Sequence, residues 1–217
     1  MMSSLRVGPV TLPSKTCPNR LICGPTCRCV ETILTNAASP SPRRSIGQTA
    51  GIDHVPAIVT REASPDDFDR YFEEGFRELG PESRHLRFFT AVRELTPELK
   101  SRLRNVDGWN HAAIIAFDAA VQLPDHPEGK PVGVARWIGG EHGPPELSVT
   151  VIDEYQGLGV GGRLMDALLA LARKRGVQRI IADVLRENSG MRALVNRYRA
   201  VVQRSDDPIV VRYRIDV

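Results

Sequence analysis

The sequence predicts an α/β fold, with one domain built on a mixed central sheet and helices on both of its faces. Three observations support this class. Strand candidates with turn residues between them follow one another across residues 112–152, as antiparallel strands do. A glycine-rich turn and an amphipathic helix then lead into another strand, and a short alternating strand closes the chain. We place this domain at residues 56–217, about 160 residues, which suffice for one core.

The first part of the predicted domain is mainly helical. A β-rich run at Ala57–Arg61 precedes Ser64–Asp67, which supplies an N-cap, a proline at the first helical position and acidic residues in the first turn. Apolar residues continue at helical spacing over residues 68–79, and a glycine then ends the helix. A second helical piece is predicted at Pro81–Phe89, and a third begins at Thr96.

The second part alternates strands with two helices. Its strand candidates carry apolar runs, its longer helix has a wide apolar stripe, and turn residues separate the elements. In chain order they are strands at Ala112–Asp118, Pro131–Ile138 and Glu146–Ile152, a helix at Val160–Lys174, a strand at Val177–Leu185, a helix at Ser189–Tyr198 and a strand at Ile209–Ile215.

Charge and composition exclude several classes of protein. The net charge is +3, but residues 1–50 hold six basic residues and one acidic residue, which leaves 23 basic and 25 acidic residues in 51–217. The predicted domain therefore has no excess of positive charge, and we expect no nucleic-acid partner. No apolar run approaches the roughly 20 residues of a membrane-spanning helix, so we expect no membrane partner.

Residues 1–55 have a different composition and are predicted to be a disordered or spurious N-terminal extension. All four cysteines lie here, as Cys17, Cys23, Cys27 and Cys29. A zinc site is an alternative, although only Cys23 and Cys27 form one of the two hooks that such sites use. An organellar transit peptide is another, although four prolines interrupt any amphipathic helix. Because the domain itself lacks cysteine, we expect a reducing, cytoplasmic location and no metal.

The glycine-rich turn at residues 157–162 is the most informative motif. It joins a strand to an amphipathic helix, where glycines let the backbone approach a ligand and expose N–H donors to an anion. No Gly-Lys-Ser/Thr follows, so this is not a Walker A loop. Gly157, Gly159 and Gly162 satisfy the dinucleotide pattern, with Asp183 further on, but too few residues follow Asp183 for the remaining units of such a fold.

Gln156, Gly159 and Gly161 also fill the pattern Gln/Arg-x-x-Gly-x-Gly/Ala, and with it residues 57–217 resemble the GNAT superfamily of N-acetyltransferases. The resemblance implies acetyl-CoA as co-substrate, its pyrophosphate on the backbone N–H groups of the turn and its pantetheine arm on the preceding strand. The positions it assigns to acetyl-CoA are Val149, Val151, Gln156, Gly157, Leu158, Gly159, Val160, Gly161, Gly162, Arg163 and Asn188.

The catalytic base is predicted to be Glu146. Attack on a thioester needs a neutral amine, so a base must remove a proton from an amine of high pKa. The segment that begins at Glu146, together with residues 80–89, is similar to bacterial protein lysine acetyltransferases, whose catalytic glutamate it would supply. An exposed carboxylate at the start of a strand is the alternative interpretation. His111 and His142 are auxiliary-base candidates or ordinary histidines.

The general acid for the leaving thiolate stays unassigned. Many GNAT enzymes carry a tyrosine seven residues after the asparagine that starts the next helix, but counting from Asn188 gives Val195 here, with Tyr198 one turn away. A free thiolate is a tolerable leaving group, so transfer does not require an acid.

The sequence therefore predicts an acetyl-CoA-dependent N-acetyltransferase that acts on a primary amine. A protein lysine is the leading acceptor. A small-molecule amine, such as a polyamine, an aminoglycoside or an amino acid, is the alternative within the same class. A non-catalytic acyl-CoA sensor is the alternative outside it. The oligomeric state is not predicted.

Overall fold

The computed structural model of the protein describes residues 52–140 and 143–217. Its centre is a sheet of seven strands, β1 (Ile58–Glu62), β2 (His111–Asp118), β3 (Lys130–Gly140), β4 (Gly143–Val151), β5 (Arg179–Leu185), β6 (Val201–Gln203) and β7 (Val210–Asp216). The strand order is β1-β2-β3-β4-β5-β7-β6. Only β4 and β5 are parallel, and the other neighbours are antiparallel. The predicted mixed sheet is confirmed.

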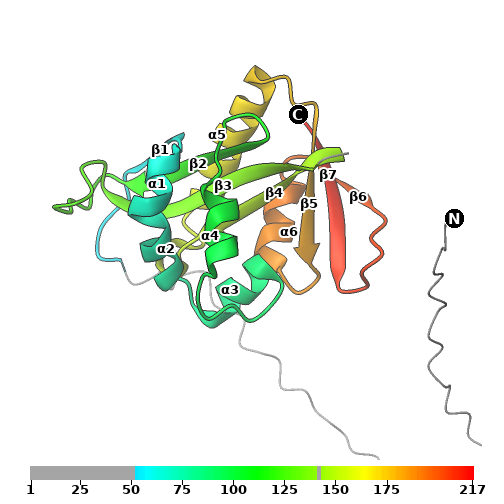
Figure 1. Ribbon diagram of the computed structural model, residues 1–217. Helices are drawn as coiled ribbons and strands as arrows, with labels where there is room; N and C mark the ends of the chain where they lie inside the picture. Colours follow the sequence, from blue (N-terminus) through cyan, green and yellow to red (C-terminus); the bar gives the residue numbers. More distant parts are fainter. Residues whose placement is uncertain (1–51, 141–142) are drawn as a thin grey trace, which may run out of the picture. The chain divides into compact units, whose positions relative to one another are not determined.

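Helices cover both faces of this sheet, as the sequence predicts (Figure 1). On one face lie α1 (Pro65–Asp67), a π-helical turn η1 (Phe68–Phe72), α2 (Glu73–Arg77), α3 (Pro81–Phe88) and α4 (Pro97–Arg104). On the opposite face lies α5 (Val160–Lys174), preceded by the 3-10 turn η2 (Asp153–Tyr155) and joined by α6 (Ser189–Asn196). The face that carries α1 to α4 is called the α1–α4 face below, and the other the α5 face.

The α5 face holds the main hydrophobic core. Trp137, Leu164, Leu168 and Ile180 are almost completely buried there, and α6 contributes Val195. The predicted apolar stripe of α5 accounts for this packing, because residues three and four positions apart all point at the sheet. The bounds of α5 are those predicted from the sequence.

The single helix predicted over residues 68–79 is wrong in its details. The structure forms α1, η1 and α2 in succession, with the π-helical turn in the middle. Asp67 holds the start of this segment, since its carboxylate accepts hydrogen bonds from Arg61 Nη1 at 2.7 Å and Nη2 at 2.8 Å and from the Ser64 backbone N–H at 2.7 Å. Within the turn, the Phe68 and Phe72 rings stack with centroids 4.5 Å apart.

Strand boundaries differ modestly from the prediction. β4 begins at Gly143 instead of Glu146, and β5 begins at Arg179 instead of Val177. β6 was not predicted at all. It has three residues, two of them exposed valines, and pairs only with β7, so tertiary pairing defines it more than any sequence pattern does.

None of the helices in the described ranges is long and apolar enough to cross a membrane. Within residues 52–140 and 143–217, no group of three or more His, Cys, Asp or Glu side chains is arranged to hold a metal ion. The four cysteines lie outside the described residues, as does the predicted N-terminal extension up to residue 51. Of its last four residues, Ile52 packs against the core and His54 Nε2 lies 2.5 Å from Asp118 Oδ2.

Candidate active site

A gap between β4 and β5 lies at the centre of the candidate site. The two strands pair at one position, Glu146 with Ile181, and separate beyond it. The Ile152 N–H donates to Val132 O at 3.1 Å, toward β3. Because backbone groups alternate along a strand, those of Val149 and Val151 point away from β3 and into the gap. In the part of the chain that the structure describes, the edge groups of Val149 and the N–H of Val151 therefore stay open for a ligand that lies as an added strand, whereas Val151 O accepts a hydrogen bond from Gln156 Nε2.

The glycine-rich turn follows directly at the wide end of this gap. Gly157 and Gly159 have φ of +79° and +83°, a left-handed conformation that glycine adopts without strain. In the part of the chain that the structure describes, no hydrogen bond uses the backbone N–H groups from Gly157 to Gly162, and Arg163 makes the first bond of α5, to Gly159 O. A run of free donors at the start of a 15-residue helix forms an anion site.

Gln156 fixes the turn through its side chain. Its Nε2 lies 3.0 Å from Ser83 Oγ on α3, 3.1 Å from Val151 O and 3.1 Å from Asp153 Oδ1. The Gln156 side chain is thus engaged within the protein, and its backbone N–H donates to Asp153 O at 3.2 Å. Arg163 is exposed, and its Nη1 lies 3.5 Å from Ile58 O on β1.

Asn188 lies across the gap, where β5 ends and α6 begins. Its Oδ1 accepts a hydrogen bond from the Met191 N–H at 2.9 Å and so caps α6. Tyr198 fastens α6 to α5, because its hydroxyl lies 2.8 Å from Asp166 Oδ1 and 3.0 Å from Gly162 O. Burial and the Asp166 carboxylate raise the pKa of Tyr198 to about 12. Val195, where a tyrosine was looked for, is fully buried in the core.

Glu146 is exposed at the point where β4 and β5 separate. Its side chain points to the α1–α4 face, since its neighbour Leu147 is buried on the other side. There it lines a cleft of about 360 Å³, called the Glu146 cleft. The other walls come from α3 with its following loop, from α4 and from β3, including Arg87, Phe89, Leu99, Arg102 and Ile138. The carboxylate can therefore reach a second substrate from the side opposite α5.

The Glu146 cleft carries more positive than negative charge. Among the described residues that line it, Glu146 is the one carboxylate, against Arg87 and Arg102. Burial lowers the pKa of Arg87 to about 10, and the nearby Glu146 charge opposes that shift. The sequence analysis did not single out these arginines as site residues. For Arg87 a signal existed, because it falls within the similar segment 80–89, whereas nothing near Arg102 in the sequence places it in the cleft.

The other candidates are not brought to the site. His111 is buried, and its Nε2 lies 3.4 Å from Arg136 Nη1. Burial, with Arg136, lowers the pKa of His111 to about 4. It does not line the Glu146 cleft. His142 lies outside the described residues. Asp183 forms a bidentate ion pair with Arg212 across β5 and β7, at 2.6 and 2.7 Å, and is occupied there.

Comparison with known proteins agrees with this geometry. The model of the acetyltransferase (GNAT) family matches residues 93–199. Over 150 residues, the chain is 33% identical to Acetyltransferase PA5475 of Pseudomonas aeruginosa, a match that covers 68% of this chain and 78% of that protein. The chain belongs to the GNAT family of acetyltransferases.

Other GNAT proteins extend the comparison. Acetyltransferase Pat of Mycolicibacterium smegmatis is 34% identical over 153 residues, and the match covers 70% of this chain but only 43% of Pat. The crystal structure of the GNAT domain of S. lividans PAT superposes with a TM-score of 0.63 at 24% identity, over 73% of this chain and 89% of that one. The chain is thus an acyltransferase with a GNAT fold, and acetyl-CoA is the donor that its family uses.

Proposed function

We propose that the chain transfers an acetyl group from acetyl-CoA to a primary amine, with Glu146 as the general base. The observation that carries this proposal is the position of Glu146. It lies where β4 and β5 separate, so its carboxylate is next to the β4 edge that faces the gap. The same carboxylate lines the Glu146 cleft of about 360 Å³ on the α1–α4 face. A donor on the β4 edge and an acceptor in the cleft would meet at this residue.

The cofactor-binding assignments fit the groups that acetyl-CoA presents. The free N–H groups from Gly157 to Gly162 suit its pyrophosphate, and the edge groups of Val149 with the N–H of Val151 suit the amides of its pantetheine arm. Gln156 would hold the turn in place, and Asn188 would fix the start of α6 on the far side of the gap. When bound, acetyl-CoA supplies an activated acyl group as a thioester.

Glu146 would act on the acceptor before and during attack. An ammonium group that enters the cleft loses one proton, and the neutral nitrogen forms a bond to the carbonyl carbon. The carbon–sulfur bond breaks, the sulfur keeps the electron pair, and a second proton leaves the nitrogen as the amide forms. Glu146, directly or through water, accepts the first proton and passes it to solvent, and then accepts the second, which ends on the departing thiolate. Tyr198 is not needed as the acid, since its hydroxyl is engaged with Asp166.

Two classes of acceptor fit this scheme. A protein lysine is the class that the sequence resemblance implies. A small amine is the second candidate, and the Glu146 cleft favours it, because α3, α4 and β3 line the space that the amine must enter. We also propose that residues 56–217 form the catalytic domain, and that deletion of residues 1–50 leaves turnover unchanged.

Free-thiol release from acetyl-CoA tests the proposal. We expect release that depends on the acceptor, measured across a panel of small amines and lysine-containing proteins. Acetyl-CoA alone at 100 times its Kd should add about 2.7 kcal/mol to the free energy of unfolding, seen as a thermal shift. Thermal stabilisation without thiol release from any acceptor would instead support an acyl-CoA sensor, and absence of both would contradict acetyl-CoA binding.

A further inference from the structure

Arg136 on β3 is a buried cation without a nearby carboxylate. Its side chain is on the α1–α4 face, and the residue is 4% exposed. Nη1 donates to Leu103 O at 3.1 Å, and the guanidinium lies over the Phe72 ring at 5.3 Å. Among the described residues, no carboxylate lies within 4.0 Å of it. Burying a charge without a counter-ion costs free energy, so this arrangement needs a reason.

Structural contacts account for its Nη1, which donates to Leu103 O and lies 3.4 Å from His111 Nε2. Leu103 O belongs to the last turn of α4, where carbonyl groups lack helical partners and a cation is favourable. A guanidinium has five N–H donors in a planar fork, however. No other hydrogen bond to an oxygen atom of the described residues is made by Arg136. The remaining donors are therefore available to a ligand.

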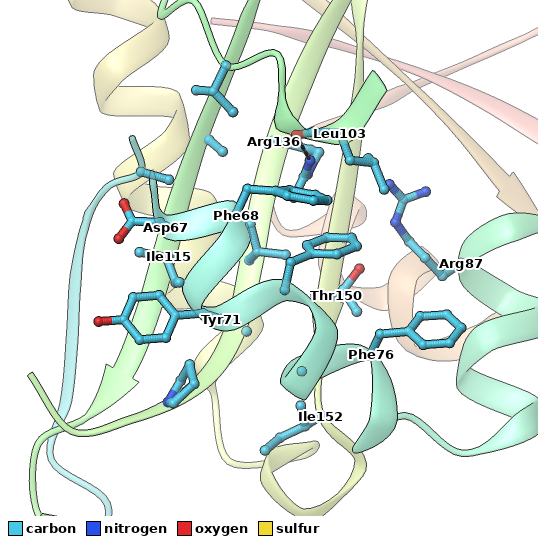
Figure 2. A pocket seen from close by; sticks show the side chains of 18 of the residues that line it. Asp67, Phe68, Tyr71, Phe76, Arg87, Leu103, Ile115, Arg136, Thr150 and Ile152 are labelled. Atoms are coloured by element: carbon cyan, nitrogen blue, oxygen red, sulfur yellow. Dashed lines mark hydrogen bonds between the residues drawn. The ribbon is translucent and has the colours of Figure 1, made fainter. Parts of the chain in front are cut away.

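Arg87 is a second unpaired cation beside Arg136. It is half-buried on α3 and lies over the Phe88 ring at 5.0 Å, no carboxylate of the described residues comes within 4.0 Å of it, and its charge lowers the pKa of Arg136. Figure 2 shows both guanidinium groups at the same end of a cavity, next to Leu103. Arg87 also lines the Glu146 cleft. Two guanidinium groups that share one space form a site for a carboxylate, which can accept from both.

The cavity in Figure 2 is mainly apolar and adjoins the Glu146 cleft. It measures about 80 Å³, and its walls include Phe68, Tyr71, Phe76 and Ile115; it is called the aromatic cavity. Its one acidic residue, Asp67, is already paired with Arg61, so neither arginine has an ion-pair partner within this cavity. An engineered apolar cavity of about 150 Å³ holds benzene, so a space of this size suits a few carbon atoms.

We propose that the acceptor is a small amine that carries a carboxylate and an apolar side chain, as the apolar α-amino acids do. This inference rests on the proposed function and narrows its acceptor. The carboxylate would pair with Arg87 and Arg136, the apolar side chain would enter the aromatic cavity, and the amine would face Glu146. Transfer forms the bond between the α-nitrogen and the acetyl carbon, breaks the carbon–sulfur bond and releases the thiol form of CoA.

Charge is the reason to prefer this class to a lysine side chain or a polyamine. An acceptor enters as an ammonium ion, and Arg87, Arg102 and Arg136 together outweigh Glu146 in the adjoining spaces. A purely cationic acceptor is repelled there. A zwitterion brings the missing anion with it, so that its carboxylate offsets the cost of the buried guanidinium groups.

A matched set of acceptors tests the proposal on the full chain. Leucine is compared with leucinamide, which has the same shape without the negative charge, and with glycine, which lacks the apolar side chain. A lysine-containing peptide represents the protein acceptor. From free-thiol release, we expect kcat/KM for leucine to exceed that for leucinamide by at least about tenfold, the effect of losing charge-assisted hydrogen bonds. Glycine should also fall below leucine.

Arg87→Gln is the decisive variant, because Arg87 is only half-buried and its side chain contacts the Phe88 ring on the same helix, at 5.0 Å. We expect it to raise KM for leucine about tenfold or more, and by a clearly larger factor than KM for leucinamide. Arg136→Lys, which keeps the charge but loses the planar fork, should act in the same direction. Arg93→Gln, at an exposed position outside both spaces, is the matched control and should change neither substrate.

The outcomes separate the carboxylate proposal from the proposed acetyl transfer. Equal rates for leucine and leucinamide, a preference for the lysine peptide, or an equal loss for both substrates in Arg87→Gln would overturn the carboxylate proposal while leaving acetyl transfer in place. Absence of thiol release from every acceptor would overturn the proposed function as well. An unchanged thermal shift with acetyl-CoA verifies that each variant is folded.

Discussion

The two faces of the central sheet differ in how they are packed. On the α5 face, one 15-residue helix lies across β1 to β4 and buries a continuous apolar core. On the α1–α4 face, the helical pieces have three to eight residues, and two spaces of about 80 and 360 Å³ remain between them and the sheet. One face thus supports the turn that we assign to acetyl-CoA, whereas the other leaves the space that we assign to an acceptor.

The two faces also differ in the charged side chains that they bury. The residues that α5 buries are apolar, and the turn that starts it presents backbone donors without a side-chain charge. The α1–α4 face instead buries Arg136 and His111 and places Arg87 beside them. Backbone groups on a stable helix suit a donor that every member of a family shares. Side-chain charges between short helices suit an acceptor that differs from one enzyme to another.

The largest expected difference between the faces is in stability. Leu164 on α5 is fully buried, so Leu164→Ala should lower the free energy of unfolding by about 2–5 kcal/mol. Leu99 on α4 is half-buried at the wall of the Glu146 cleft, and Leu99→Ala should cost only about 1 kcal/mol. Urea denaturation of both variants measures the comparison. Equal losses would show that the α1–α4 face is as tightly packed as the α5 face.

Acidification should destabilise the protein through His111. Its pKa is about 4 in the folded chain, against 6.5 for the free side chain, so the unfolded state binds more protons between these values. The contribution of neutral His111 to the free energy of unfolding should therefore be fully present above pH 6.5. It should fall by about 3 kcal/mol as the pH drops toward 4. His111→Gln should flatten this part of the profile. A wild-type Tm that declines no more steeply than that of the variant contradicts a neutral, buried His111.

The turn at the start of α5 should respond to loss of a single glycine. Gly159 has φ of +83°, so Gly159→Ala strains the backbone by about 1–2 kcal/mol and shifts the donors that we assign to the pyrophosphate. We expect a higher Kd for acetyl-CoA and an unchanged KM for the acceptor. Gly176→Ala, just beyond the other end of α5 at a φ of +72°, where an added Cβ meets nothing within 4 Å, is the matched control and should leave binding intact. A rise in acceptor KM alone would mean that the turn serves the other substrate.

The smallest effect is expected at Tyr198. Because its hydroxyl joins α6 to Asp166 and Gly162 on α5, Tyr198→Phe should cost about 1 kcal/mol of stability and leave kcat unchanged. Thermal unfolding and thiol release measure the two quantities. A fall in kcat of tenfold or more would instead identify Tyr198 as the acid that protonates the thiolate.

The sequence predicts the α5 face better than the α1–α4 face, for a physical reason. The Gln156-to-Gly162 turn and the stripe of α5 are local patterns, so their conformation depends on neighbours in the chain. The start of α4 is also a local pattern. As predicted, Thr96 begins this helix, and its hydroxyl accepts a hydrogen bond from the Leu99 N–H at 3.3 Å. Glu146 was found only through its resemblance to related enzymes, since a carboxylate at a strand start is not informative by itself.

The acceptor side depends on contacts between distant residues. In the sequence, Arg136 occupies a polar position of an alternating strand, which predicts exposure. It is buried because α4 packs over it and brings Leu103 O, 33 residues away in the chain, within hydrogen-bond distance. Arg102 reaches the Glu146 cleft because α3, α4 and β3 meet there. The π-helical turn at Phe68–Phe72 reflects the packing of Phe68 and Tyr71 against the sheet, which a helical apolar repeat alone does not reveal.

We expect Glu146 to act on the acceptor and not on the donor, and a comparison of cofactor binding with turnover separates these two roles. Acetyl-CoA Kd and turnover are determined side by side for the wild type and Glu146→Gln, with Glu94→Gln at an exposed position outside the cleft as control. Turnover of Glu146→Gln should fall by about 10²–10⁴-fold, while the Kd stays within about twofold. Unchanged turnover, or a Kd that rises in proportion to the lost turnover, would contradict the assignment of Glu146 as the base.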